Sequence, residues 1–254
     1  MHDMVSLAEQ IKLDPTDISS IQTYIRELIR TNSTIPLSII HDYLFHKYKK
    51  VIYLNDFTIS LKSSFISDLN WLRNLYLPSP YVLRLSHNQI SSLDGLSNLN
   101  APNLTDLHLT LNKITYLDGL SNFNAYKLQH LYLNGNKITS LDGLSGFKAP
   151  NLQELYFNGN KITSLNDLSD FNAPKLRILS LSDNSITSLN GLSNFNAPNL
   201  RIIDIRQNNI TSLTGLNKLQ APELEAIYLR RLPAYLLNDL YEQRPNIARC
   251  IQFF

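Results

Sequence analysis

The chain is poor in cysteine, in charge and in long apolar runs. Cys250 is its one cysteine, so no disulfide can form within the chain. Charged residues make up 17% of the 254 residues and the net charge is +2, which creates no overall field that selects nucleic acid or a membrane surface. No apolar stretch reaches the roughly 18 residues of a membrane-spanning helix. These absences argue against a disulfide-stapled fold, a nucleic-acid partner and a membrane partner.

Motifs that carry enzymatic chemistry are also missing. The sequence has no phosphate-binding glycine loop, no paired metal-ligand motif and no Gly-x-Ser-x-Gly. We therefore expect a non-enzymatic protein that needs no cofactor. The first ten residues lack the basic and apolar regions of a secretory signal, so we expect a cytoplasmic protein. We also expect a monomer.

The dominant feature of the sequence is a repeat of 24 residues. From Leu104 to Pro222 the pattern Leu-x-x-Leu-x-Leu-x-x-Asn-x-Ile-x-x-Leu-x-Gly-Leu-x-x-Phe returns five times without insertion, with a few substitutions at its apolar and glycine positions. Counting back finds one clean earlier repeat and a degenerate one from Asp56, and counting forward reaches Ile227 and Leu229. Repeats of this length indicate a stacked array. We predict eight strands, one in each repeat.

Each recurring position has a predicted structural role. The alternating leucines indicate a short strand, and stacking identical strands about 4.8 Å apart gives a parallel sheet. The asparagine that follows offers two donors and an acceptor, so we expect it to serve its own turn and the next one. This column consists of Asn88, Asn112, Asn136, Asn160, Asn184 and Asn208.

Two further columns lie on the returning arm, the part of each repeat that follows the asparagine and leads back to the next strand. We expect the phenylalanines to form an apolar spine at the back of the array; they are Phe123, Phe147, Phe171 and Phe195. Glycine occupies another position, which we interpret as one that needs a positive φ. Its members are Gly95, Gly119, Gly143, Gly191 and Gly215, with Asp167 in the remaining repeat. We expect only short helical turns on this side.

These residues resemble the leucine-rich-repeat proteins, in particular the intracellular kind that regulates phosphatases and the internalin-like arrays. The resemblance covers about residues 56–232. It implies an α/β fold, a curved right-handed solenoid with a parallel concave sheet, and a role in binding another protein. Extracellular members usually close their ends with disulfide-bonded caps, and a chain with one cysteine cannot.

The ends of the array need covers, because an uncapped repeat exposes an apolar cross-section. We predict a helical N-terminal cap over residues 1–55, the repeat array over 56–232 and a C-terminal cap with a short helix over 233–254. Residues 34–50 also resemble the start of an F-box. An F-box would make the chain a substrate adaptor of a ubiquitin ligase, with the repeats capturing the substrate.

Positions that differ between repeats are free to specify a partner. The outward strand positions are aromatic and acidic in the centre and carry arginine toward both ends, and tyrosine and arginine are the residues that anchor interfaces. The residues that we expect to bind a partner protein on the concave face are Arg84, Asp106, His108, His130, Tyr132, Glu154, Tyr156, Asp204, Arg206 and Tyr228.

Two other interpretations of these positions are open. Exposed strand positions favour tyrosine and threonine for reasons of packing alone. A metal site could be built from Asp106, His108, His130 and Glu154, but the surface is open and no supporting groups are expected behind these side chains. We therefore predict no metal site.

Overall fold

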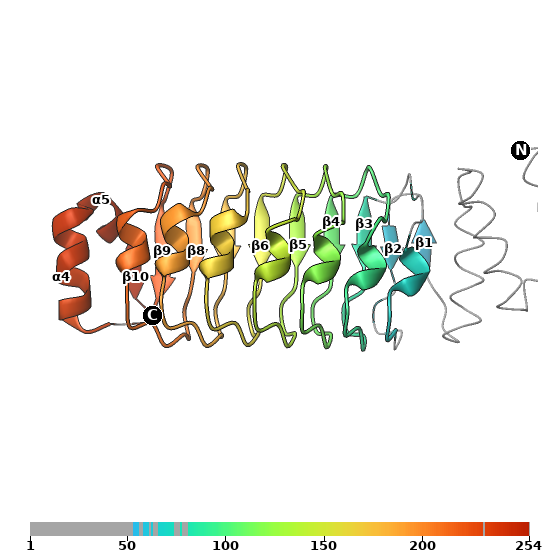
Figure 1. The fold of residues 1–254 in the computed structure, drawn as a ribbon, viewed down its shortest axis with the longest axis horizontal. Coiled ribbons are helices and arrows are strands. Elements are labelled where there is room, and N and C mark those ends of the chain that lie inside the picture. Colours follow the sequence, from blue (N-terminus) through green and yellow to red (C-terminus); the bar gives the residue numbers. More distant parts are fainter. Residues whose placement is uncertain are drawn as a thin grey trace, which may run out of the picture.

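The computed structural model describes residues 53–55, 58–60, 62, 66–73, 77, 81–230 and 232–253. The predicted N-terminal cap, apart from residues 53–55, and the F-box-like segment 34–50 lie outside this part of the chain. The described repeats stand side by side along the longest axis, with a layer of strands behind a layer of short helical turns (Figure 1).

The strands form one sheet of ten, arranged in sequence order. Strands β2 to β10 are parallel, and β1 pairs antiparallel with β2. Each pair from β2 onward joins residues 24 apart, for example Leu107 with Leu131, so the predicted array of eight repeat strands is confirmed. The strands are β1 Tyr53–Asn55, β2 Thr58–Ser60, β3 Val82–Arg84, β4 Asp106–His108, β5 His130–Tyr132, β6 Glu154–Tyr156, β7 Ile178–Ser180, β8 Ile202–Asp204, β9 Ala226–Leu229 and β10 Ile251–Phe253.

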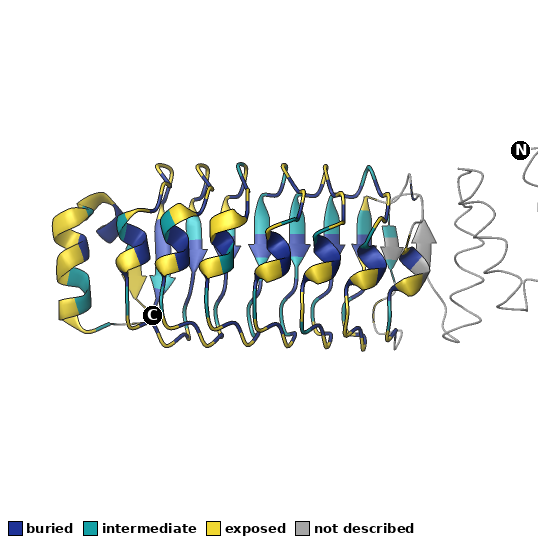
Figure 2. Cartoon of the chain, in the orientation of Figure 1, coloured by how far each residue is buried: buried dark blue, intermediate teal, exposed yellow. Residues whose placement is uncertain are grey.

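Short 3₁₀ turns cover the opposite side of the sheet, as expected. They are η1 Asn70–Leu72, η2 Asp94–Leu96, η3 Asp118–Leu120, η4 Asp142–Leu144, η5 Asn166–Asp170, η6 Asn190–Asn194 and η7 Thr214–Asn217. Each of these turns contains both exposed and buried residues (Figure 2). Strand and turn leucines thus meet in one continuous core that runs the length of the array.

The phenylalanine spine is confirmed. The rings of Phe123, Phe147, Phe171 and Phe195 stack nearly parallel along the array, with centroids 6.2–6.4 Å apart. All four are buried. Because neighbouring rings lie nearly parallel in the buried core, each repeat packs on the next at the back of the molecule as well as through the sheet.

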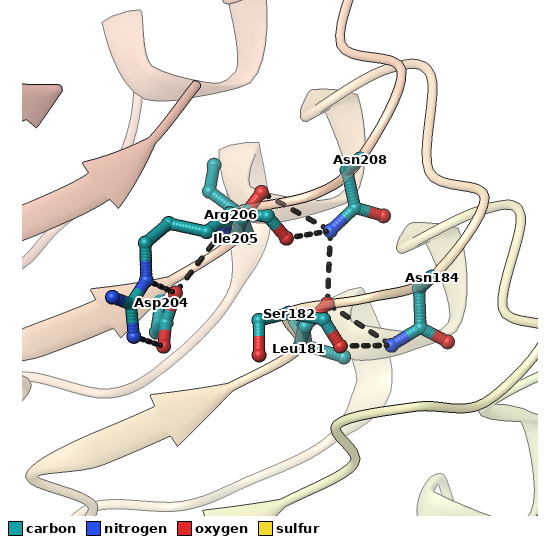
Figure 3. A network of polar contacts seen from close by, with 7 residues as sticks. All are labelled: Leu181, Ser182, Asn184, Asp204, Ile205, Arg206 and Asn208. Carbon is teal, nitrogen blue, oxygen red and sulfur yellow. Dashed lines mark hydrogen bonds and ion pairs between the residues drawn. The ribbon is translucent and has the colours of Figure 1, made fainter. Parts of the chain in front are cut away.

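The asparagine column links each repeat to the preceding one, whereas the sequence suggested a link to the next. Asn136 Oδ1 accepts a bond from the Ile114 amide of the previous repeat, and its Nδ2 donates to Leu133 O in its own turn and to Leu109 O in the previous one. Figure 3 shows the same pattern for Asn184 and Asn208, both of which donate to Leu181 O. All six members are buried.

The glycine column has a different cause from the one predicted. Among the described glycines, the two with a positive φ are Gly135 and Gly159, and each directly precedes an asparagine of the column. At Gly143 a β-carbon would lie 2.3 Å from the Leu117 carbonyl carbon, so glycine is needed because two repeats approach closely there. Asp167 replaces this glycine in one repeat, and its carboxylate accepts bonds from Ser140 Oγ and the Leu141 amide.

The C-terminal end carries the predicted helix and adds elements that were not predicted. Helix α4 spans Ala234–Gln243, a short α5 spans Pro245–Ala248, and β10 extends the sheet by one strand. Arg244 lies between the two helices and donates to Asn217 O at 2.7 Å and to Leu219 O at 3.1 Å. These bonds satisfy carbonyls at the end of η7.

The asparagine column generates the first prediction. We expect Asn136→Ala to lower the free energy of unfolding by about 1–3 kcal/mol for each buried group left without a partner. Chemical denaturation followed by circular dichroism measures the change. Asn122→Ala is the control. Asn122 is an exposed asparagine outside the asparagine column, so this variant should behave like the wild type. Equal stability of the two variants would contradict the role given to the column.

The close approach of repeats generates the second prediction. We expect Gly143→Ala to lower the free energy of unfolding by about 1–3 kcal/mol, because the added methyl group meets backbone that has no room to move. Thr139→Ala, at an exposed position on the same arm, serves as the matched control. A melting temperature unchanged by Gly143→Ala would show that the contact between these repeats is looser than the structure describes.

Candidate functional site

The sheet has one face that points away from the core, formed from β3 to β9 by the first and third residues of each strand. We call this surface the sheet face. Along β4, β5 and β6 the middle leucine is buried while the residues on either side of it are partly exposed. Nine of the ten predicted site residues occupy these outward strand positions, and Arg206 follows two residues after β8.

An aromatic stack runs across three neighbouring strands of the sheet face. The ring centroids of His108 and Tyr132 are 4.5 Å apart, and the angle between their planes is 11°. The ring centroids of Tyr132 and Tyr156 are 5.1 Å apart, and the angle between their planes is 6°. The register produces this stack, because the three residues hold the same position on β4, β5 and β6. The rings are half-buried and support one another, so their orientation is fixed before any partner arrives.

The acidic residues beside the stack are held by hydrogen bonds. Asp106 Oδ1 lies 2.9 Å from His130 Nδ1, and its Oδ2 accepts from the Thr105 hydroxyl at 2.6 Å. Glu154 Oε2 accepts from the Tyr156 hydroxyl at 2.9 Å. The central part of the sheet face is therefore an ordered polar and aromatic surface, in which each carboxylate has a defined position.

A second group of predicted residues lies toward the C-terminal end of the sheet face. Arg206 Nε and Nη2 donate to the two carboxylate oxygens of Asp204 at 2.9 and 2.7 Å, as Figure 3 shows. The guanidinium carbon lies 5.6 Å from the centroid of the Tyr228 ring, within range of a cation–π contact. Asp204 is only 8% exposed, so its charge is largely buried and is compensated by Arg206.

The structure thus divides the predicted site into two clusters. The central cluster contains His108, Tyr132 and Tyr156 with the three polar residues beside them, and the C-terminal cluster contains Asp204, Arg206 and Tyr228. Ser180 lies between the clusters and is buried. Arg84 lies at the other end of the face, one strand away from His108 in register.

A cavity next to the C-terminal cluster was not recognised from the sequence. It has a volume of about 410 Å³ and is lined by Ser182, Arg206, Gln207 and Arg230. These residues follow the ends of β7, β8 and β9. The sequence signal for it is the pair of arginines 24 residues apart, because that spacing places them on neighbouring strands.

Burial and neighbouring charges shift several pKa values on the sheet face. Burial lowers the pKa of His108, and the positive charge of Arg84 lowers it further. Burial also raises the pKa of Tyr132 and, together with the hydrogen bond to Glu154, that of Tyr156. At neutral pH the stack therefore presents a neutral imidazole and two neutral phenols.

Among the residues that the structure describes, no group of three His, Cys, Asp or Glu side chains is placed to hold a metal ion. No described helix combines the length and the hydropathy needed to cross a bilayer.

The pKa of His108 provides a third prediction. Nuclear magnetic resonance titration should find it below the ordinary value of 6.5, and Arg84→Gln should raise it, because the repelling guanidinium is removed. A group that resists protonation only in the folded state makes stability fall as pH drops below 6.5. Lys113→Gln, at an exposed position on the returning arm, is the control. An ordinary His108 pKa in the wild type would contradict the described packing of the stack.

Comparison with known families and structures agrees with the repeat architecture. The family model described as leucine-rich repeats in two copies matches residues 126–170 and 174–230, and a second leucine-rich-repeat model matches residues 100–120. No curated protein matches the sequence.

Two solved structures of internalins from Listeria monocytogenes are similar. One internalin (inlF) is 23% identical to this chain with a TM-score of 0.54. The match covers 82% of this chain and 55% of the internalin chain. This chain therefore spans about half the length of that internalin chain. Internalin C2 (inlC2) is 23% identical to this chain with a TM-score of 0.46. The match covers 81% of this chain and 92% of the internalin C2 chain. The matched repeats identify the chain as a leucine-rich-repeat protein, and its stacked fold is similar to that of the internalin (inlF) structure.

Proposed function

We propose that this chain is a non-enzymatic interaction module that binds another protein through the sheet face. The observation that carries the proposal is the stack of His108, Tyr132 and Tyr156, which is half-exposed and rigid. Aromatic side chains that are ordered before binding lose little conformational entropy when a partner covers them. They are suited to form the centre of an interface.

The distribution of variation supports the same proposal. Leucine or isoleucine fills the middle strand position from β3 to β9, whereas the outward positions change in size and charge from strand to strand. A sheet that served stability alone would not need this variety. The leucine-rich-repeat fold also suits protein recognition, because its strands offer one continuous surface on the order of 800 Å² per partner.

The polar groups of the sheet face add specificity. Asp106 and Glu154 flank the stack in defined positions, so a partner must match their charges as well as the aromatic rings. Cys250, the one thiol of the chain, donates to Leu224 O at 3.0 Å and burial raises its pKa. A thiol in this environment is a poor nucleophile, in keeping with a non-enzymatic role.

The proposal is tested by the double variant Tyr132→Ala with Tyr156→Ala. We expect it to lose capture of the protein that the wild type retains from native lysate, measured by quantitative mass spectrometry. Tyr116 and Tyr126 are exposed and lie outside the sheet face, so Tyr116→Ala with Tyr126→Ala removes two tyrosines from elsewhere on the surface as the control.

The melting curves of both double variants should stay close to that of the wild type. A protein captured by the wild type and the control, but not by the stack variant, is the expected result. Equal capture by all three chains would place the interface away from the stack and contradict the proposal.

A further inference from the structure

The C-terminal part of the sheet face carries a cavity. Each described lining residue has a side chain that can donate a hydrogen bond. Two guanidinium groups, one hydroxyl and one carboxamide surround its volume of about 410 Å³; they belong to Arg206, Arg230, Ser182 and Gln207. No carboxylate is among the described lining residues. A cavity of this composition favours an anionic group.

The orientation of Arg206 is fixed by its neighbours. Asp204 accepts from both Nε and Nη2 of its guanidinium, and the same carboxylate accepts from the Arg206 backbone amide at 3.1 Å. The Tyr228 ring lies beside the guanidinium carbon at 5.6 Å. Arg206 thus forms a rigid wall of the cavity, and its own charge is already balanced by Asp204.

Arg230 is in a different position. Arg230 lies just beyond β9, at the repeat position that Arg206 holds beyond β8, since the two are 24 residues apart and these strands pair in register. Within the described part of the chain Arg230 forms no ion pair, and it is exposed. Because Asp204 already balances Arg206, an anion in the cavity would act mainly as a counterion for Arg230.

We propose that this cavity binds the carboxylate side chain of an acidic segment of the partner protein, with Arg230 as the principal contact and Ser182 and Gln207 as additional donors. The inference rests on the proposed function, because it names the chemistry of the partner at one end of the same face. A guanidinium matches a carboxylate in plane and can donate two parallel hydrogen bonds.

The rest of the sheet face favours a short acidic segment over a long polyanion. Asp106 and Glu154 lie along the same face, on β4 and β6, and would repel a nucleic-acid backbone that extended from the cavity toward the aromatic stack. An acidic residue at the end of a binding segment, followed by residues that reach the stack, avoids this repulsion.

The test uses the full chain and two probes, the peptide acetyl-Glu-Glu-Glu-Glu-amide and inorganic phosphate. Nuclear magnetic resonance spectra record the arginine Nε–H signals during each titration. We expect the peptide to shift the Arg230 signal in a saturable way. Arg230→Gln should weaken binding about tenfold, because a charge-assisted hydrogen bond is lost. Ser182→Ala should weaken it by a smaller factor.

Arg201→Gln is the matched control. Arg201 is also exposed and precedes β8, but it lies outside the cavity and faces Glu225 at 3.4 Å. We expect this variant to bind the peptide like the wild type. Equal weakening by Arg201→Gln and Arg230→Gln would show general surface attraction and overturn the inference.

Two other results would also overturn the inference. One is a peptide titration without a saturable Arg230 shift, and the other is saturable binding of phosphate but not of the peptide. None of these outcomes bears on the proposed function, because that proposal fails only if capture survives removal of the tyrosine stack.

Discussion

The structure depends on one constraint, that each repeat must fit directly on the preceding one. Three interactions enforce it at different depths of the array. Asn136 and its equivalents join the buried turns of consecutive repeats, Gly143 and its equivalents allow their backbones to touch, and the phenylalanine spine closes the back. Because all three act between neighbours 24 residues apart, the register of the sheet follows from them, and the register in turn places the side chains of the sheet face.

Much of this fold could be predicted from the sequence because its interactions repeat. The strand positions, the spine and the short turns each follow from a residue type that returns with the same period. Strand β10 was not predicted, because the asparagine and its flanking leucines are absent there. A further step of 24 residues from Ile227 nevertheless reaches Ile251, which pairs with it. The role of the glycines was predicted wrongly, since a sequence does not distinguish a special backbone angle from a close contact.

The candidate site could be predicted in part. Alternation along strands identified which side chains share the sheet face, and the stack of Tyr132 on Tyr156 follows from the register. The separation into two clusters could not be predicted, because it depends on Arg206 turning back onto Asp204 and on Ser180 being buried. The cavity beside Arg230 escaped for a similar reason, since its other lining residues come from turns whose conformation only the structure describes.

The central claim is that the asparagine column holds consecutive repeats in register, and amide hydrogen exchange tests it most directly. The amides of Ile90, Ile114, Ile138, Ile162 and Ile186 each donate to an asparagine of the next repeat. We predict that these amides exchange slowly and at similar rates, because opening one requires separating two repeats. Fast exchange at these isoleucines, comparable to that of exposed surface amides, would contradict the account.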